Sequence, residues 1–336
     1  MIPVNTTILQ TAGWQEQLRD MVRDGKELLQ LLQLDPDAMP DISAALRQFP
    51  LRVPRHFVGK MRPGDWRDPL LLQVLPQKAE NDLQPGFVDD PLGERHANPA
   101  PGLIHKYHGR VLMITTPACA VHCRYCFRRN FPYQDNNPSR AHWQQALDYI
   151  SARPDIGEVI LSGGDPLSAS DDYLAELIAR IAAIPHVHTL RLHSRLPVVL
   201  PARVTDSLLQ VLTQHRMQTV LVIHSNHPNE LDQDTATALQ NLRRAGITLL
   251  NQSVLLKGIN DDADTLATLS ERLFQCHTLP YYLHLLDKVR GAGHFECSQQ
   301  RAQQLRESLL VRLPGYLVPR LVREEAGASS KTPIAI

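Results

Sequence analysis

The stretch CAVHCRYCF, residues 119–127, places three cysteines in a C-x3-C-x2-C arrangement. Three thiolates can ligate three irons of a [4Fe–4S] cluster and leave the fourth iron free to bind a small molecule. The alternative is a structural zinc site, which usually needs four ligands. His122 lies inside the stretch, where a fourth ligand would be cramped, and no second CxxC pair exists elsewhere in the chain. The stretch therefore favours an iron–sulfur cluster over zinc.

The composition limits the class of protein. The 336 residues suffice for one large α/β domain or two ordinary ones, and 35 Lys and Arg residues balance 35 Asp and Glu residues. A formal net charge of zero gives no reason to expect nucleic-acid binding. The N-terminus does not resemble a signal peptide, and no apolar run is long enough to span a membrane. Five cysteines, three of them clustered, suit the reducing cytoplasm, where we expect the protein to act.

The first hundred residues differ from the rest of the chain in their residue pattern. Helices are predicted over 14–32 and 41–49, and closely spaced prolines then exclude long helices and central strands. We expect an N-terminal helical and irregular wrap over residues 1–102, a barrel domain over 103–312 and a C-terminal segment over 313–336.

From Arg110 onward, short apolar runs rich in β-branched residues alternate with longer amphipathic runs. The predicted strands are 111–115, 158–161, 188–193, 218–224, 248–254 and 281–286. The predicted helices are 140–152, 170–183, 205–215, 232–245, 263–275 and 298–312, with Ser139, Ser170, Thr205 and Ser298 as capping residues. Alternating strands and helices imply parallel pairing with right-handed crossovers. Six such units are too few to close an eight-stranded barrel, so an α/β fold with an open, partial (βα)6 barrel is predicted.

Polar segments follow the predicted strands, at the rim where barrel enzymes place their sites. The cysteine stretch follows the first strand and Ser162-Gly163-Gly164-Asp165 follows the second, while Asp287 follows the sixth. Glycines after a strand let the backbone approach a ligand closely, and their position one unit after the cysteine stretch favours this role over a simple tight turn. Convergence of these segments on one face predicts a large shared pocket.

Several charged residues could hold a ligand in that pocket. Lys331 lies near the C-terminus, where a lysine is usually solvated. Small residues precede it and Pro333 follows, so it could also enter a pocket and form a Schiff base with a carbonyl cofactor. Glu324-Glu325 is either a solvated charge run or, with Asp287, a site for a cation. Arg110, Arg128 and Arg129 could bind phosphate or carboxylate, and His224 and His227 fit a core or a rim position equally well.

Taken together, these segments resemble the lysine 2,3-aminomutase family of radical S-adenosylmethionine (SAM) and pyridoxal 5′-phosphate (PLP) enzymes. The resemblance covers about residues 103–333. It rests on the cysteine stretch with Arg128-Arg129, then on LSGGDPL (161–167), SRLPVVLP (194–201), HSNHPNE (224–230), NQSVLLKGIND (251–261), PYYLHLLD (280–287) and KTP (331–333).

The length resembles the short branch of this family, which lacks a C-terminal extension and works with bacterial elongation factor P. The resemblance implies conversion of L-α-lysine into (R)-β-lysine, which a separate ligase attaches to a lysine of that factor. It also implies a [4Fe–4S] cluster, SAM, PLP and an electron donor such as flavodoxin, without nucleic acid or membrane as partners.

The resemblance also assigns roles to individual residues. It implies that Cys119, Cys123 and Cys126 ligate the cluster, and that Lys331 forms the Schiff base with PLP. Ser162, Gly163, Gly164 and Asp165 are expected to bind a cofactor, and Arg110 and Gln252 to contact PLP. Arg128 matches the residue that pairs with the substrate carboxylate, and Asp287 and Glu324 match two acids that bind its ε-ammonium. Glu324 replaces an aspartate of the long enzymes, and His284 replaces a tyrosine.

Other interpretations stay open at this point. One is a radical SAM aminomutase for another amino acid, such as glutamate, although paired acids would repel an anionic side chain. Another is a catabolic enzyme that forms (S)-β-lysine. The last is a non-catalytic, metal-bearing module that binds a translation factor.

Overall fold

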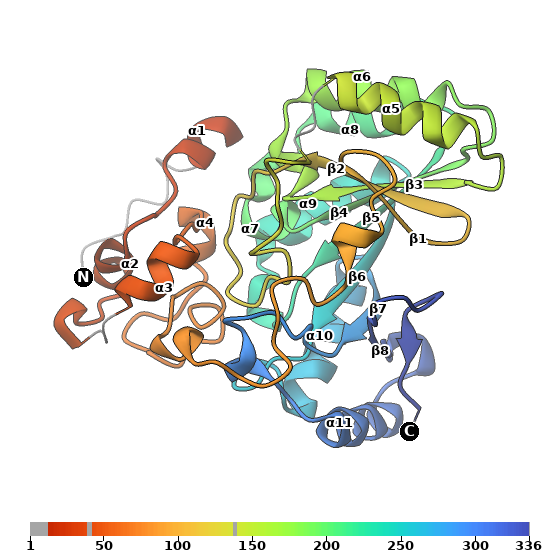
Figure 1. Cartoon of the computed structure of the whole chain (residues 1–336). Coiled ribbons are helices and arrows are strands. Elements are labelled where there is room, and N and C mark those ends of the chain that lie inside the picture. Colours follow the sequence, from red (N-terminus) through yellow and green to blue (C-terminus); the bar gives the residue numbers. More distant parts are fainter. Residues whose placement is uncertain (1–12, 39–41, 137–139, 336) are drawn as a thin grey trace.

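A single nine-stranded sheet organises the protein in the computed structural model, which describes residues 13–38, 42–136 and 140–335. The strands lie in sequence order across the sheet, and the central seven run parallel (Figure 1). These are β2 (Arg110–Thr116), β3 (Glu158–Gly163), β4 (Thr189–Ser194), β5 (Gln218–His224), β6 (Thr248–Val254), β7 (Leu279–His284) and β8 (Arg320–Arg323). The short strands β1 (Leu103–Tyr107) and β9 (Thr332–Pro333) pair antiparallel to β2 and β8 at the two edges.

The open, partial barrel predicted from the sequence is confirmed. All six predicted strands are present as β2 to β7, and β1 and β9 do not pair with one another among the described residues. Two of the three additional strands, β8 and β9, escaped prediction because they are only four and two residues long, too short to show alternation. The strands β8 and β9 add the C-terminal segment to this sheet, while the predicted domain boundaries stay a prediction.

Six longer helices connect the parallel strands, as expected for this topology. They are α5 (Arg140–Ser151), α6 (Asp171–Ala182), α8 (Asp206–Thr213), α9 (Gln233–Arg244), α10 (Ala263–Gln275) and α11 (Gln299–Arg312), and a short α7 (Leu196–Val199) follows β4. The side chains of Ser170, Thr205 and Ser298 cap α6, α8 and α11 by accepting a backbone N–H three residues later. The fourth predicted cap, Ser139, lies outside the described residues.

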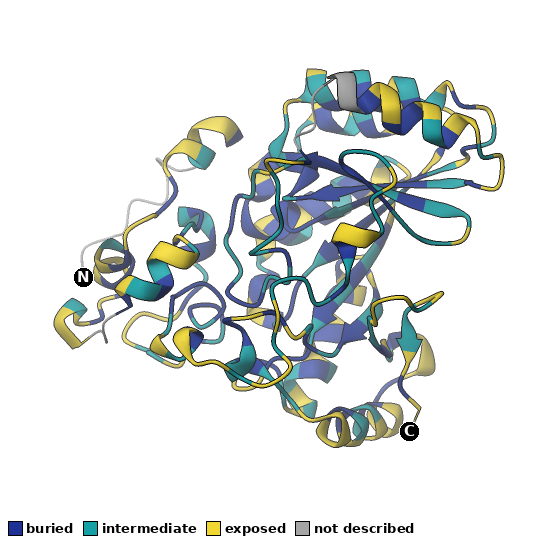
Figure 2. Cartoon of the chain, viewed as in Figure 1, coloured by how far each residue is buried: buried dark blue, intermediate teal, exposed yellow. Residues whose placement is uncertain are grey.

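The core lies between the sheet and these helices. Strand β3 is almost entirely buried, from Val159 to Gly163, as expected for a parallel strand covered on both faces. In Figure 2, buried residues fill the sheet and the inner sides of the helices, and exposed residues lie on the outer sides. The curved sheet is thereby a rigid frame for the polar side chains that follow its strands.

The N-terminal wrap packs beside the barrel and contains α1 (Trp14–Arg19), α2 (Gly25–Leu31), α3 (Ser43–Gln48) and α4 (Arg55–Val58). The prediction of one helix over 14–32 was wrong. The backbone of Val22 instead pairs with Val53 through two hydrogen bonds of 2.9 and 3.0 Å, and Asp24 caps α2. The predicted second helix is α3, and Asp41 at its expected start lies outside the described residues.

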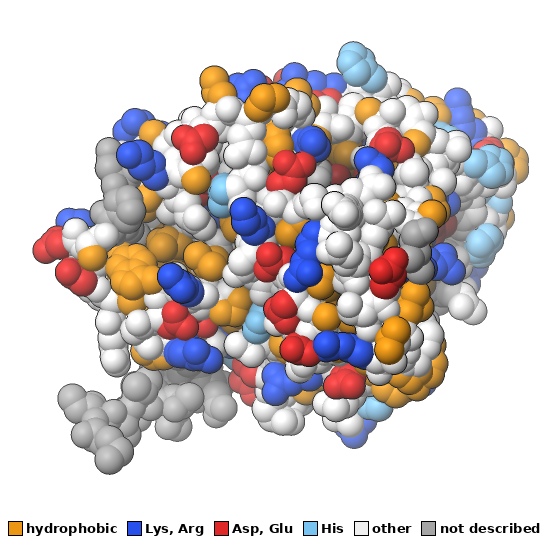
Figure 3. All heavy atoms as spheres, turned by 90° about the horizontal axis from the view of Figure 1, so that it is seen from below, with side chains coloured by type: hydrophobic (Ala, Val, Ile, Leu, Met, Phe, Trp, Pro, Cys, Tyr) orange, Lys and Arg blue, Asp and Glu red, His pale blue; other side chains and the backbone are white. Residues whose placement is uncertain are grey.

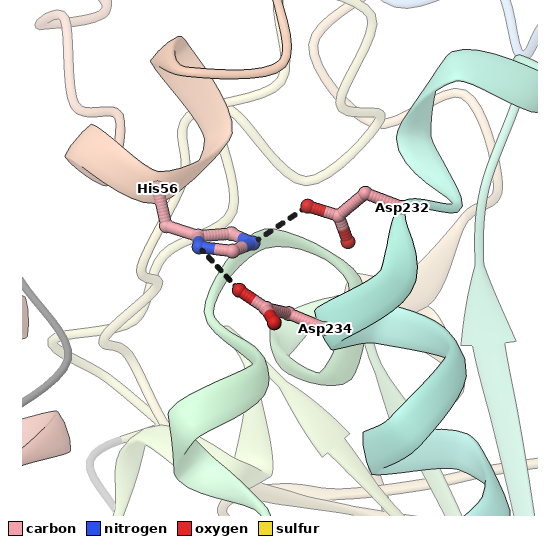
Figure 4. A group of neighbouring side chains, drawn as sticks. All are labelled: His56, Asp232 and Asp234. Atoms are coloured by element: carbon pink, nitrogen blue, oxygen red, sulfur yellow. Dashed lines mark ion pairs between the residues drawn. The ribbon is translucent and has the colours of Figure 1, made fainter. Parts of the chain in front are cut away.

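Ion pairs attach this wrap to the start of α9 (Figure 4). Nε2 of His56 lies 3.2 Å from Oδ2 of Asp232, and its Nδ1 lies 3.9 Å from Asp234. The buried Nζ of Lys60 lies 3.1 Å from the other oxygen of Asp232 and donates to the Val198 carbonyl. Because a lysine already neutralises Asp232, we interpret this group as an attachment of the wrap to the barrel.

The surface carries charges of both signs. On the face shown in Figure 3, Lys and Arg side chains lie among Asp and Glu side chains, in agreement with the formal net charge of zero. Within the described part of the chain, no helix combines the length and the apolar character that a membrane span requires.

Candidate active site

A cavity of about 650 Å³ opens inside the curved sheet, within the size range of cofactor and substrate sites. Its walls include the cysteine loop, the strands β1 to β7 and the C-terminal tail. All site residues predicted from the sequence line it, namely Arg110, Cys119, Cys123, Cys126, Arg128, Ser162, Gly163, Gly164, Asp165, Gln252, Asp287, Glu324 and Lys331. The fold therefore brings these residues together, while their individual roles stay predictions.

The cysteine loop follows β2, and all three cysteines line the cavity. Among the described residues, the one group of three potential metal ligands within 4.8 Å of one another is His56, Asp232 and Asp234. At least two of the three cysteine sulfurs are therefore more than 4.8 Å apart, farther than the roughly 3.8 Å between sulfurs that a Zn–S bond of about 2.3 Å gives in a tetrahedral site. In this arrangement the three sulfurs are not placed to bind a single tetrahedral zinc ion.

His122 does not supply a fourth ligand in this arrangement. Its ring stacks on Phe49 with 4.6 Å between the ring centroids, and its Nδ1 lies 2.8 Å from the Pro50 carbonyl oxygen. Burial lowers the pKa of His122 to about 4, so the imidazole is neutral. His122 thus joins the loop to the wrap.

The loop is also fixed from behind by a buried group of charges. The Glu80 carboxylate of the wrap accepts hydrogen bonds of 2.8 and 2.5 Å from Arg124 and one of 2.9 Å from Arg129. All three side chains are almost fully buried. Arg129, a candidate for phosphate binding, is therefore committed to Glu80 instead.

The glycine pair allows the loop after β3 to approach the cysteine loop. Gly163 has a φ of +118°, and a Cβ at Gly164 would overlap the Ala118 carbonyl oxygen. Gly164 N–H donates to the Thr116 carbonyl, and the Gly163 carbonyl accepts from the Tyr133 hydroxyl. These two groups already have protein partners, so close packing explains the glycines and their predicted contact with a cofactor stays a prediction.

Asp165 organises the start of the loop after β4. Its carboxylate accepts from the Ser194 hydroxyl at 2.7 Å and from the backbone N–H groups of Leu167, Arg195 and Leu196. Burial raises the pKa of Asp165, and these hydrogen bonds counteract the increase. The observed contacts of Asp165 give it a positioning role toward Arg195.

Arg128 is paired with a residue that the sequence did not single out. Glu94 accepts from Nε and one terminal nitrogen of Arg128 at 2.8 and 2.7 Å, and the other terminal nitrogen donates to Ser162 Oγ at 3.0 Å. The negative charge of Glu94 overcomes the effect of burial and raises the pKa of Arg128 above its usual range. Arg128 is therefore a fixed cation on the cavity wall.

Lys331 lies at the other group of charges in the cavity. Its Nζ is 2.6 Å from Oε2 of Glu324, and Nζ of Lys106 is 2.7 Å from Oε1 of the same carboxylate. Glu324 keeps only 14% of its side chain exposed, so it is no part of a solvated charge run. The two lysines hold the pKa of Glu324 far below its usual range against the opposing effect of burial.

Asp287 lies in the same part of the cavity, and among the described residues it has no comparable direct partner. Burial and the neighbouring Glu324 raise the pKa of Asp287 to about 7, although Lys331 and Lys106 oppose the increase. Nearby, His284 is buried and held neutral, because burial and Lys331 lower its pKa. The part of the cavity around Lys331 can thus accept a further positive charge at Asp287.

Arg110 and Gln252 line the cavity from β2 and β6. The Arg110 guanidinium lies 4.9 Å from the centre of the Tyr107 ring. The histidines left open by the sequence have protein partners, because Nε2 of His224 lies 2.9 Å from the Tyr125 hydroxyl and Nδ1 of His227 accepts from Asn229 N–H.

Sequence reasoning missed Glu94 and Lys106. Lys106 is two residues from Ile104 in β1, and both line the cavity. Side chains two residues apart in a strand share a face, so recognition of β1 would have indicated Lys106 as a cavity residue. Glu94 lies in a turn of the wrap, where no local pattern indicates a site.

Comparison with known proteins agrees with this geometry. A family profile described as the Radical SAM superfamily matches residues 113–269, which include the cysteine loop and the strands β3 to β6. The fold and the site therefore define a radical SAM enzyme, a class that uses a [4Fe–4S] cluster and SAM.

Relatives named L-lysine 2,3-aminomutase match nearly the whole chain. The protein from Escherichia coli (strain K12) is 50% identical over 96% of this chain and 94% of its own length. The Haemophilus influenzae protein is 50% identical over 99% and 98%, and the Clostridium subterminale protein is 34% identical over 96% and 77%. The chain belongs to the L-lysine 2,3-aminomutase family, and it is a radical SAM isomerase.

Proposed function

We propose that this aminomutase binds PLP through Lys331 and converts L-α-lysine into (R)-β-lysine. The observation that carries the proposal is the position of Lys331, whose amine enters the cavity that the three cysteines also line. A lysine amine in a water-poor pocket can form a Schiff base with a carbonyl cofactor. The three cysteines would hold the cluster that, with SAM, would supply radical chemistry for hydrogen removal, and Lys331 would hold PLP, whose conjugated ring would assist migration of the amino group.

The charges beside Lys331 suit a substrate with a cationic side chain. Asp287 and Glu324 provide two carboxylates, and Lys106 and Lys331 provide two amines. When the cofactor engages the Lys331 amine, Lys106 balances one carboxylate, and the other is left for the ε-ammonium of lysine. An ammonium group there favours ionised Asp287, whereas an anionic side chain such as that of glutamate would be repelled.

Arg128 is suited to hold the α-carboxylate. An arginine has five N–H groups, and Glu94 uses two of them while Ser162 uses one. The remaining two N–H groups, one on each terminal nitrogen, can donate to a carboxylate. Arg128 at one end and Asp287 with Glu324 at the other would then select an amino acid of the length of lysine.

We extend the proposal to the physiological role. The resemblance to the short branch of the family supports transfer of the product to a ligase that modifies elongation factor P in the cytoplasm, with a reduced protein such as flavodoxin as electron donor. The test adds the reaction product, the ligase and elongation factor P, and measures the mass of the factor. A mass increase of one β-lysyl group is expected, and an unchanged mass with (R)-β-lysine present would contradict this role.

The activity is tested with anaerobic protein that has been reconstituted with iron and sulfide. SAM, PLP, dithionite and L-lysine are added, and the product is analysed by chiral chromatography with mass detection. We expect (R)-β-lysine, and none from Lys331→Ala. Formation of (S)-β-lysine would overturn the handedness and the link to elongation factor P. Cleavage of SAM to 5′-deoxyadenosine without β-lysine would overturn lysine as the substrate.

A further inference from the structure

Arg195 makes a direct contact with one of the cysteines. One terminal nitrogen of its guanidinium donates to Sγ of Cys123 at 2.8 Å. The Cys123 sulfur stands here for the thiolate that ligates an iron in the loaded enzyme. The Arg52 guanidinium, by contrast, donates to the Cys119 carbonyl at 3.1 Å and not to its sulfur.

The guanidinium is held in this position from several sides. Its second terminal nitrogen donates to Gln73 Oε1 at 2.6 Å and to Glu230 Oε2 at 3.0 Å. The Phe57 and Tyr125 rings lie 5.3 and 5.8 Å from it. With only 6% of Arg195 exposed to solvent, the side chain has little room to turn away from Cys123.

The residues that hold Arg195 are fixed in turn. The Glu230 carboxylate also accepts from the backbone N–H groups of Asn226 and His227 and from Gln73 Nε2. Asp165 holds the Arg195 backbone through a hydrogen bond of 2.7 Å. Arg195 is thus held by the wrap, the cysteine loop, the loop after β3 and the loop after β5. Together these four segments fix one N–H group of Arg195 against the Cys123 sulfur.

The Arg195 guanidinium is shared between the Glu230 carboxylate and the Cys123 sulfur. Glu230 pairs with the terminal nitrogen that does not contact Cys123, and Nε of Arg195 is buried without a hydrogen-bond partner among the described residues. A positive charge and an N–H donor therefore lie next to the sulfur in a region of low dielectric constant. Hydrogen bonds to cluster sulfurs and net charge around a cluster set its reduction potential, because they stabilise the more negative, reduced state.

We propose that Arg195 is a positioning residue that tunes the cluster: its hydrogen bond to the Cys123 sulfur raises the reduction potential of the [4Fe–4S] cluster. The consequence is easier acceptance of one electron by the oxidised cluster. Arg195 comes from the loop after β4, outside the cysteine loop, so the barrel itself would participate in control of the electron transfer that starts the reaction.

The test measures the reduction potential, which does not depend on turnover. Reconstituted full-length protein is titrated anaerobically with dithionite, and the reduced cluster is quantified by electron paramagnetic resonance. For Arg195→Gln we expect at least a tenfold lower ratio of reduced to oxidised cluster at a fixed potential, equal to a shift of about 59 mV to more negative values for one electron. Arg195→Lys should shift in the same direction by a smaller amount, because the charge is kept while the guanidinium donor is lost.

Arg203→Gln is the matched control. Arg203 is fully buried and pairs with Asp171, but it donates to the Leu167 carbonyl and not to a sulfur. The Arg203→Gln change should leave the ratio of reduced to oxidised cluster at a fixed potential within twofold of that of the parent protein. If Arg195→Gln does not fold or retain iron, Arg195→Lys decides the question. An unchanged or raised potential in the Arg195 variants, or an equal shift in Arg203→Gln, would overturn the proposal.

Discussion

The two ends of the cavity are built on different physical principles. The cluster end consists of Cys119, Cys123 and Cys126 with the buried side chains behind them, where each charge is matched by fixed hydrogen bonds. The lysine end consists of Lys106, Asp287, Glu324 and Lys331. There two amines share one carboxylate, and a second carboxylate has a pKa near neutrality.

This difference suggests that the two ends of the cavity have different tasks in the reaction. The cluster end must keep the same geometry while an electron arrives, so rigidity is useful there. The lysine end must exchange its ion pairs when the cofactor and the substrate enter, and the partial exposure of Lys331, 22% of its side chain, leaves room for that exchange. Damage at one end should therefore leave the other end unchanged.

The largest effect is expected for Lys331→Ala at the lysine end. Without this amine PLP has no covalent attachment, so absorbance from the bound cofactor and β-lysine formation should both fall below detection. Iron content and the electron paramagnetic resonance signal should match the parent protein, because the cluster end is untouched. Substantial turnover by this variant would refute the assignment of Lys331.

Next in size is Glu80→Gln, behind the cluster end. The change leaves Arg124 and Arg129 buried without their anionic partner, which costs about 3–5 kcal/mol of unfolding free energy. Urea denaturation should show the loss, together with fewer irons per chain. The exposed pair of Arg312 and Asp264 offers a control, since Asp264→Asn should change stability by less than about 1 kcal/mol. Equal losses from both variants would contradict the importance of the buried group.

A smaller effect is expected for Asp287→Asn. If Asp287 binds the ε-ammonium, KM for L-lysine should rise about 10- to 100-fold, since removal of one partner of a buried charge pair costs a few kcal/mol. Binding of norleucine, a neutral amino acid of similar length, should change much less. Glu325→Gln, at the exposed neighbour of Glu324, should leave both values unchanged. Equal losses for lysine and norleucine in Asp287→Asn would refute the proposed role.

The smallest effect is a pH dependence at the lysine end. Because the pKa of Asp287 is raised to about 7, the carboxyl group must release a proton below this pH before it can pair with an ammonium group. The Kd of L-lysine should therefore decrease as pH rises toward 7, by up to about tenfold per pH unit, and level off above it. Calorimetric titration can measure this slope. A slope that persists in Asp287→Asn would assign it to another group.

The sequence allowed prediction of the cluster end more completely than of the lysine end. The cysteine spacing is local, and the strands and helices from Arg110 onward follow clear periodicities, so the open barrel and its rim were predictable. Lys106 and Glu324 are 218 residues apart, and no local pattern indicates such a pair. The break in the first predicted helix has the same origin, because it depends on pairing of Val22 with Val53. Contacts between distant segments determined what sequence patterns alone did not reveal.

The central claim is that one cavity joins a radical SAM cluster to PLP at Lys331. The most direct test incubates the reconstituted protein with PLP, reduces it with borohydride and maps the modified lysine by mass spectrometry after proteolysis. Lys331 should carry the pyridoxyl phosphate group. Modification of Lys106, the other lysine that lines the cavity, or of no cavity lysine, would contradict the account.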